Sequence, residues 1–441
     1  KTAGGALDID GDLTITSGEL AMDGNNADVA TGKTITVGPD GTSDGTLSIT
    51  TGTFTANGSS SDINGTLIIN GAGVYDADGT FDGTSGAVRF NGSGGSLRLG
   101  GATVTSIGGT FVHGTGTVEY DYAGNQSVKA RNYYNLEIDG TNTSHVKSVV
   151  NSFTVDNNLT VSTNSAFDVL ARTITVTGAS DINGILNING SGILDANGSF
   201  DATSGSITMD GTARLQLNST VTSLGTLDDA AGTVEYDQEG NQTILSTHTY
   251  YDLEIDGSGS KSTDGNTTAN GDVSITAAGT LNSGAGDDNL TIGGDFTIAS
   301  GGVFIGTAGG SVTTEKITFN GASSAGESCP AIDDANLSIE VDKSDASGTL
   351  TISGNSNFDA VTVLDGTMDI AATTFTADDA ISVQSNGTLQ VGSGTFTASS
   401  STSISGTLKV GSGTFNADGQ LTTSGEIDFT GSGSQGDLIC S

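Results

Sequence analysis

GTLQVGSGTFTA occupies residues 387–398, and GTLKVGSGTFNA follows at 406–417, nineteen residues later at every position. In the first stretch, Leu389 and Val391 alternate with polar residues, and two further apolar residues alternate in the same way after the glycines. Alternation with a period of two is typical of a β-strand that buries one face. Each stretch is therefore predicted to form two short strands that meet at a Gly-Ser-Gly turn.

A related repeat lies near the beginning of the chain. GTLSITTGTFTA at 45–56 is followed by GTLIINGAGVYDA at 65–77. A unit of about 20 residues cannot bury its own apolar face, so such units must stack on one another as a solenoid. Parallel strands joined by crossover connections are right-handed in nearly all proteins. The sequence thus predicts an all-β fold, a right-handed parallel β-helix with rungs of about 20 residues.

The sequence also contains a longer repeat of about 117 residues, which comprises several rungs. The motif GTVEYD at 116–121 returns at 232–237, and YYNLEIDG at 133–140 returns as YYDLEIDG at 250–257. We infer that a block of several rungs has been duplicated.

Three segments are expected along the chain. Residues 1–324 form a β-solenoid that includes both copies of the long repeat, and residues 347–441 continue the rungs into a C-terminal tail. Between them, the pattern is interrupted at 325–346, which contains Cys329 next to Pro330. We expect this interval to be an irregular loop, because proline cannot donate a hydrogen bond within a sheet.

The duplicated motifs also carry a family resemblance. Gly-Thr-Val-Glu-Tyr is followed by Gly-Asn-Gln at 124–126 and 240–242, and then by Tyr-Tyr-x-Leu-x-Ile. This pattern resembles the β-strand-repeat regions of large surface proteins of the Bacteroidota and, more loosely, the β-helical shafts of filamentous-haemagglutinin-like adhesins. The resemblance implies a cell-surface or secreted protein that serves as a stalk or an adhesin.

The charge of the chain limits its partners. Fifty-one acidic residues against thirteen basic ones give a net charge of -38, which repels nucleic acid and anionic lipid. We therefore expect no nucleic-acid partner, and the lack of a long apolar run predicts no membrane insertion. The chain begins at Lys1 without Met, which favours a secreted and processed protein at the cell surface or outside the cell.

Acidic residues recur at the spacing of one rung. Val118 and Tyr120 are expected to face inward, which leaves the carboxylates between and after them outside. Stacking would place each carboxylate beside its counterpart on the next rung, and like charges at that distance favour a bridging cation. The alternative is a solvated acidic face with no metal. The possible calcium ligands are Glu119, Asp121, Glu137, Asp139, Glu235, Asp237, Glu254 and Asp256.

The same carboxylates raise the question of catalysis. Stacked carboxylates would lie about 5 Å apart, which matches a retaining glycosidase. However, the pairs recur identically in both copies, and His113, His145 and His248 are isolated in the sequence. A duplicated ladder is more typical of architecture than of an active site. We therefore expect no enzyme and no required cofactor, with Ca²⁺ as an optional ligand.

Cys329 and Cys440 are the two cysteines of the chain. In an oxidising compartment they are expected to form one disulfide, either within the chain or between subunits. An intrachain bond would fix the tail against the rungs, and an intersubunit bond would join two copies.

These observations favour a structural surface protein. We expect a stiff solenoid rod that assembles head to tail with copies of itself into a filament, stalk or matrix. The first alternative is an adhesin that binds glycans or a host protein through its lateral face. The second is a polysaccharide-active β-helix enzyme.

Overall fold

The structure is a computed structural model that describes most of the chain. It describes residues 1–39, 44–228, 230–283, 288–306, 315–322, 326–345, 347–371, 373–429 and 436–440. Over these residues the chain forms strands and turns and contains no helix. The strands pair in parallel, and each pairs with strands of neighbouring rungs. The predicted parallel β-solenoid is therefore confirmed.

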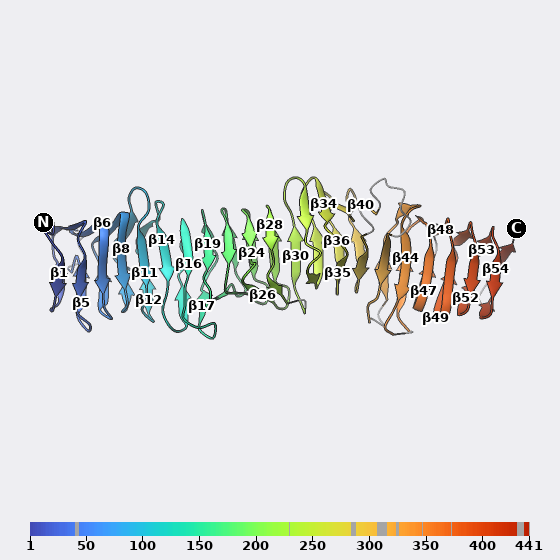
Figure 1. The fold of residues 1–441 in the computed structure, drawn as a ribbon, viewed down its shortest axis with the longest axis horizontal. Coiled ribbons are helices and arrows are strands. Elements are labelled where there is room, and N and C mark those ends of the chain that lie inside the picture. The colour runs from blue at the N-terminus through green and yellow to red at the C-terminus, as the bar shows by residue number, and fades with distance from the viewer. Residues whose placement is uncertain are drawn as a thin grey trace. The chain divides into compact units, whose positions relative to one another are not determined.

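The chain divides into two compact units, Lys1–Asp228 and Asp229–Ser441. Within each unit, consecutive rungs lie side by side in chain order (Figure 1). The strands of the first unit are β1 Leu7–Ile9, β2 Leu13–Ile15, β3 Gly18–Asp23, β4 Ala27–Val29, β5 Thr34–Val37, β6 Gly45–Ala56, β7 Ser60–Ile63, β8 Thr66–Ala77, β9 Phe81–Asp82, β10 Ala87–Phe90, β11 Ser96–Leu99, β12 Val104–Ser106, β13 Thr110–Val112, β14 Thr117–Tyr120, β15 Gln126–Val128, β16 Asn135–Ile138, β17 Val146–Val149, β18 Phe153–Val155, β19 Leu159–Val161, β20 Ala166–Asp168, β21 Thr173–Val176, β22 Ser180–Ile182, β23 Ile185–Ile188, β24 Ile193–Ala196, β25 Phe200–Asp201, β26 Ser206–Met209, β27 Arg214–Leu217, β28 Val221–Ser223 and β29 Thr226–Leu227.

The second unit continues the same construction. Its strands are β30 Thr233–Tyr236, β31 Gln242–Ile244, β32 Thr249–Tyr250, β33 Asp252–Ile255, β34 Ser260–Thr263, β35 Thr267–Ala269, β36 Val273–Ile275, β37 Thr280–Asn282, β38 Leu290–Ile292, β39 Phe296–Ile298, β40 Val303–Ile305, β41 Lys316–Phe319, β42 Glu327–Cys329, β43 Asp333–Asp334, β44 Ser338–Asp342, β45 Thr349–Ile352, β46 Ser356–Phe358, β47 Val361–Ile370, β48 Thr374–Ala377, β49 Ile381–Val391, β50 Thr395–Ala398, β51 Thr402–Ile404, β52 Thr407–Val410, β53 Thr414–Ala417, β54 Leu421–Thr423, β55 Glu426–Asp428 and β56 Asp437–Cys440.

A rung in the first unit has three sides. β16, β17 and β18 follow one another along the chain and belong to three different sheets, and β19 then returns to the sheet of β16. The stacked positions Leu136, Leu159, Ser180 and Phe200 are separated by 23, 21 and 20 residues. The turns absorb these differences in length, because only the strands must keep register.

Alternate side chains of each strand fill the interior. In β16, Leu136 and Ile138 are buried, whereas the residues beside them are partly exposed. Each inward side chain packs on the equivalent side chain of the next rung, so the core is a set of columns along the solenoid.

The stretch that predicts the fold shows this stacking directly. Phe358, Phe375, Phe396 and Phe415 form a column with ring centroids 5.5, 4.9 and 5.3 Å apart. At the predicted Gly-Ser-Gly turn, a Cβ atom on Gly413 would lie 2.2 Å from the backbone oxygen of the glycine one rung earlier. Glycine is therefore required where successive turns approach so closely.

The structure differs from the expected irregular loop at 325–346. Its two end residues lie outside the described residues, but the interior contains β42, β43 and β44. These strands pair with β45, β46 and β47, respectively. Pro330 lies in the turn after β42 and so leaves the sheet hydrogen bonds intact.

Candidate functional site

The first carboxylate ladder lies on β14 and β16. The register pairs Glu119 with Glu137, as the spacing predicted. The backbone N–H of Asp139 donates to the carbonyl oxygen of Tyr120 at 3.0 Å, so the pairing continues to the residues after the strands. Like charges on adjacent strands repel, and the ladder therefore needs a compensating cation.

Arg98 supplies one such cation. It pairs in register with Glu119 from the preceding rung, and its Nε lies 2.9 Å from Oε2 of Glu119. The Glu119 side chain is 10% exposed. Burial raises the pKa of Glu119 to about 7; the charge of Arg98 opposes this rise, and Asp121, Glu137 and Asp139 add to it.

Lys147 supplies a second cation from inside the solenoid. This side chain is fully buried, and its Nζ donates to the carbonyl oxygens of Tyr122 at 2.6 Å and Gly124 at 3.0 Å. Burial lowers the pKa of Lys147, and the negative charges of Asp121 and Asp139 act against that shift. The aspartates that we predicted as calcium ligands thus lie near a buried ammonium group.

The second copy repeats the arrangement. Glu235 pairs with Glu254 in register, and Lys261 is fully buried. Burial lowers the pKa of Lys261, while the charges of Glu239, Asp237 and Asp256 oppose the change. The Nζ atom of this lysine donates to the carbonyl oxygens of Gln238, Gly240, Gly257 and Ser258 at 2.7, 3.3, 3.3 and 2.8 Å.

These lysines bear on the calcium hypothesis. In the part of the chain that the structure describes, no group of three or more His, Cys, Asp or Glu side chains is placed to hold a metal ion. Arg98 and Lys147 lie near carboxylates of the first copy, and Lys261 lies near Asp237 and Asp256 of the second. Calcium binding at the two ladders stays a prediction.

The tyrosines of the duplicated motif are also explained by structure. Tyr120 and Tyr133 are fully buried, with their hydroxyl oxygens 3.0 Å apart. The backbone N–H of Lys129 donates to the Tyr120 hydroxyl, and the Tyr133 hydroxyl donates to the carbonyl oxygen of the same residue. Tyr236 and Tyr250 form the same pair in the second copy, at 2.9 Å. The tyrosine pair fixes the chain between the two strands.

The Gly-Asn-Gln motif connects consecutive rungs. Asn125 Oδ1 accepts a hydrogen bond from the backbone N–H of Val146, and Asn241 Oδ1 accepts one from Ser260, at 2.9 and 3.0 Å. The glutamines that follow stack on the buried lysines in both copies. The motif therefore orders the turn and packs against the buried ammonium group.

Of the two disulfides that the sequence left open for Cys329 and Cys440, the intrachain bond does not form in this structure. Both cysteines are free, with Cys329 buried in β42 and Cys440 exposed in β56. β56 is separated by five strand spacings from β43, the strand that follows Cys329. Five spacings of about 4.8 Å exceed the distance of about 7 Å that a disulfide can bridge between Cα atoms. An intersubunit bond stays a prediction, and the burial of Cys329 means that its rung would have to open for such a bond to form.

The three cations were not predicted, although the sequence pattern indicates them. Lys147 has the same strand parity as inward-facing Val149, and Lys261 has the same parity as the buried Thr263. A lysine at an inward position in both copies of a duplicated block indicates a buried role. Arg98 stands one rung before Glu119, at a spacing of 21 residues.

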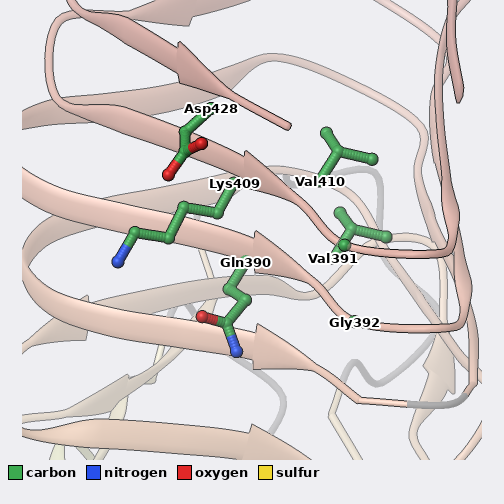
Figure 2. Close-up of a pocket in the computed structure, with 7 residues that line it drawn as sticks. Gln390, Val391, Gly392, Lys409, Val410 and Asp428 are labelled. Atoms are coloured by element: carbon green, nitrogen blue, oxygen red, sulfur yellow. The ribbon is translucent and has the colours of Figure 1, made fainter. Parts of the chain in front are cut away.

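A shallow surface hollow lies on the second unit. Gln390, Lys409 and Asp428 stack in register, and Figure 2 shows their side chains on the same side of three consecutive strands. Val391 and Val410, which also line the hollow, are buried. The three stacked side chains offer polar groups of both charge signs along the outer face.

No known protein family matches this chain, and no curated protein matches it either. In the portion of the chain with described structure, none of the segments is a helix long and apolar enough to cross a membrane.

Proposed function

We propose that this protein is a structural component of an extracellular surface, in which the solenoid acts as a stiff spacer. The in-register stacking of like side chains is the observation that carries this proposal, and the phenylalanine column of the second unit is its clearest instance. A column of this kind resists bending, because bending must separate rings on one side and compress them on the other.

The duplicated ladder supports the same role. Glu119 is held by Arg98, and the neighbouring aspartates lie near a buried lysine. Groups engaged in this way stabilise the rungs, whereas a catalytic pair must be available to a substrate. We therefore propose a non-catalytic protein.

We also propose that copies associate head to tail. Parallel sheets can be extended when a strand from a second molecule adds to an edge, and a heterologous contact of this kind produces open filaments. Negative-stain electron microscopy of the purified protein tests both ideas. We expect straight particles that join end to end, with or without reductant, because Cys329 is buried. Compact or flexible particles would refute the spacer, and separate straight particles would refute only the filament.

An adhesin is the second candidate. The hollow lined by Gln390, Lys409 and Asp428 offers hydrogen-bond donors and acceptors that suit a neutral glycan. A glycan array tests this function. Binding of a glycan by the wild-type protein that is lost in Lys409→Ala would establish the adhesin. If no glycan binds, the adhesin is refuted and the spacer function remains.

A further inference from the structure

A buried lysine and glutamate meet in the second unit. Glu327 opens β42, and Lys343 directly follows β44. The Lys343 side chain is 0% exposed and the Glu327 side chain is 3% exposed, and Nζ of the lysine donates to Oε2 of the glutamate. The Phe319 ring centroid lies 5.7 Å from the same Nζ. An amine and a carboxyl group are thus in contact where water has no access.

The surrounding backbone is shaped for these two side chains. A Cβ atom on Gly321 would lie 2.2 Å from Oε1 of Glu327, and one on Gly366 would lie 2.6 Å from Cγ of Lys343. Glycines therefore leave room for both the carboxyl group and the lysine stem. Such a fit fixes the two groups relative to each other before any reaction takes place.

Burial acts against the charged form of each group. Burial raises the pKa of Glu327 and lowers the pKa of Lys343, and the hydrogen bond between them opposes both shifts. Two opposite charges in an apolar interior pay a large desolvation cost, which transfer of one proton from the ammonium to the carboxylate removes. Oε1 of Glu327 is buried and has no hydrogen-bond partner among the described residues. A free amine and a carboxylic acid, the products of that transfer, are the reactants of amide formation.

We propose that Lys343 and Glu327 condense into an intramolecular amide cross-link. The nitrogen lone pair of the neutral Lys343 amine attacks Cδ of Glu327, and the N–C bond forms. The carboxyl hydroxyl then leaves with a proton from the same nitrogen, so that one water molecule is released. No electron is transferred and no co-reactant is consumed. Holding the groups in contact replaces the bimolecular encounter that makes this condensation slow in water.

A second lysine–glutamate pair in the same unit provides a matched comparison. Nζ of Lys316 lies 2.7 Å from Oε1 of Glu340, but these side chains are 36% and 18% exposed. Water reaches both side chains there, and the pair lacks the closed surroundings of Lys343 and Glu327. The Nζ atom of the buried Lys261 donates to backbone carbonyl oxygens, and it therefore offers a second comparison.

Mass spectrometry of the intact, folded full chain tests the cross-link. We expect the wild-type protein to be lighter than its sequence by one water molecule, and Lys343→Met to have the full mass of its own sequence. Trypsin should cleave after Lys316 and fail to cleave after Lys343. Fragmentation should yield a branched peptide that joins Lys343 to Glu327.

The wild-type measurement decides the question even if the variant does not fold. A full-length mass in protein with a β-type circular dichroism spectrum, together with cleavage after Lys343, would overturn the proposal. A water loss that fragmentation places at an Asp-Gly step, such as Asp139-Gly140, would also overturn it, because a cyclised aspartate loses the same mass.

Discussion

At the scale of single residues, the interior of this solenoid contains charged groups where a simple pattern would place only apolar ones. Lys147 and Lys261 are fully buried, and each has backbone carbonyl oxygens as partners. Buried charges persist only when such partners replace the lost water. The two lysines therefore constrain the rungs that they connect.

Replacement of Lys147 tests this role. Lys147→Met should lower the free energy of unfolding by about 2 kcal/mol, because it removes two partly buried hydrogen bonds to carbonyl oxygens and leaves two aspartates without their nearby cation. Urea denaturation measures the loss. Lys33→Met, at a partly exposed position in the same unit, is the control and should change the free energy by less than about 0.5 kcal/mol.

The same variant addresses calcium. Because lysine and arginine already compensate the first ladder, the melting temperature of the wild-type protein should be equal in calcium and in EDTA. In Lys147→Met, the aspartates lose this compensation, and calcium should raise the melting temperature. A calcium-dependent rise in the wild-type protein would instead support a native metal site.

Glu119 predicts a pH dependence of stability. Its pKa in the folded state is raised from 4.5 to about 7, so the folded protein holds this proton more tightly than the unfolded chain does. Its contribution to stability is therefore full below about pH 4.5 and falls as the pH rises to about 7. The wild-type protein should therefore lose free energy of unfolding between about pH 5 and pH 8. In Glu119→Gln this loss should be smaller by about 1 kcal/mol.

Denaturant unfolding at the two pH values measures this difference. Glu19→Gln, at an exposed position in the same unit, should leave the pH dependence of the wild-type protein unchanged. An equal effect of the two substitutions would show that the net charge of the unit, and not the burial of Glu119, causes the dependence.

At the scale of elements, stability depends on columns of stacked side chains. Phe396 of β50 packs between Phe375 and Phe415. Phe396→Ala removes contacts with both neighbours and should lower the free energy of unfolding by about 3–5 kcal/mol. Thr397→Ala, one position along the same strand on the outer face, should cost less than about 1 kcal/mol. Similar losses in both variants, measured by urea denaturation, would contradict the column.

Much of this arrangement could be predicted from the sequence. Period-two alternation and repeats of 19 to 21 residues are enough to predict parallel stacking, and the rung length is enough to place Glu119 beside Glu137. The buried lysines were harder to predict, because a lysine at an inward position is usually interpreted as a surface residue. The partners of Lys147 and Lys261 are backbone carbonyl oxygens. Because every residue has such an oxygen, these partners cannot be recognised from the sequence.

The repeat could have excluded an intrachain disulfide. At about 20 residues a rung, the separation of Cys329 and Cys440 along the chain corresponds to more than five rungs, which is too far for a disulfide to bridge. The interval 325–346 was misjudged because Pro330 suggested a break, although the proline occupies a turn between β42 and β43. The position of Pro330 within its rung, by contrast, is not determined by the repeat length alone.

At the scale of the whole molecule, charge affects contacts between the sides of two copies, whereas stacking affects contacts along the solenoid. A net charge of -38 on a surface of outward-facing polar residues repels other copies that approach from the side. Contacts along the stack depend instead on backbone hydrogen bonds and apolar columns, which the charge opposes less. Higher salt should therefore promote lateral association more than it changes the stability of the rungs.

Stacking also predicts how far the destabilisation caused by one substitution extends along the solenoid. Each rung contacts mainly its neighbours, so the stability of a solenoid is approximately a sum over rungs and the interfaces between them. Phe396→Ala should therefore accelerate hydrogen exchange of the amides in β48, β50 and β53, while the amides of β14 and β16 in the first unit exchange as in the wild-type protein. Hydrogen exchange followed by mass spectrometry resolves these segments. Equal acceleration in both units would show that the chain unfolds as one cooperative body, and a local effect would establish that each rung depends on its immediate neighbours.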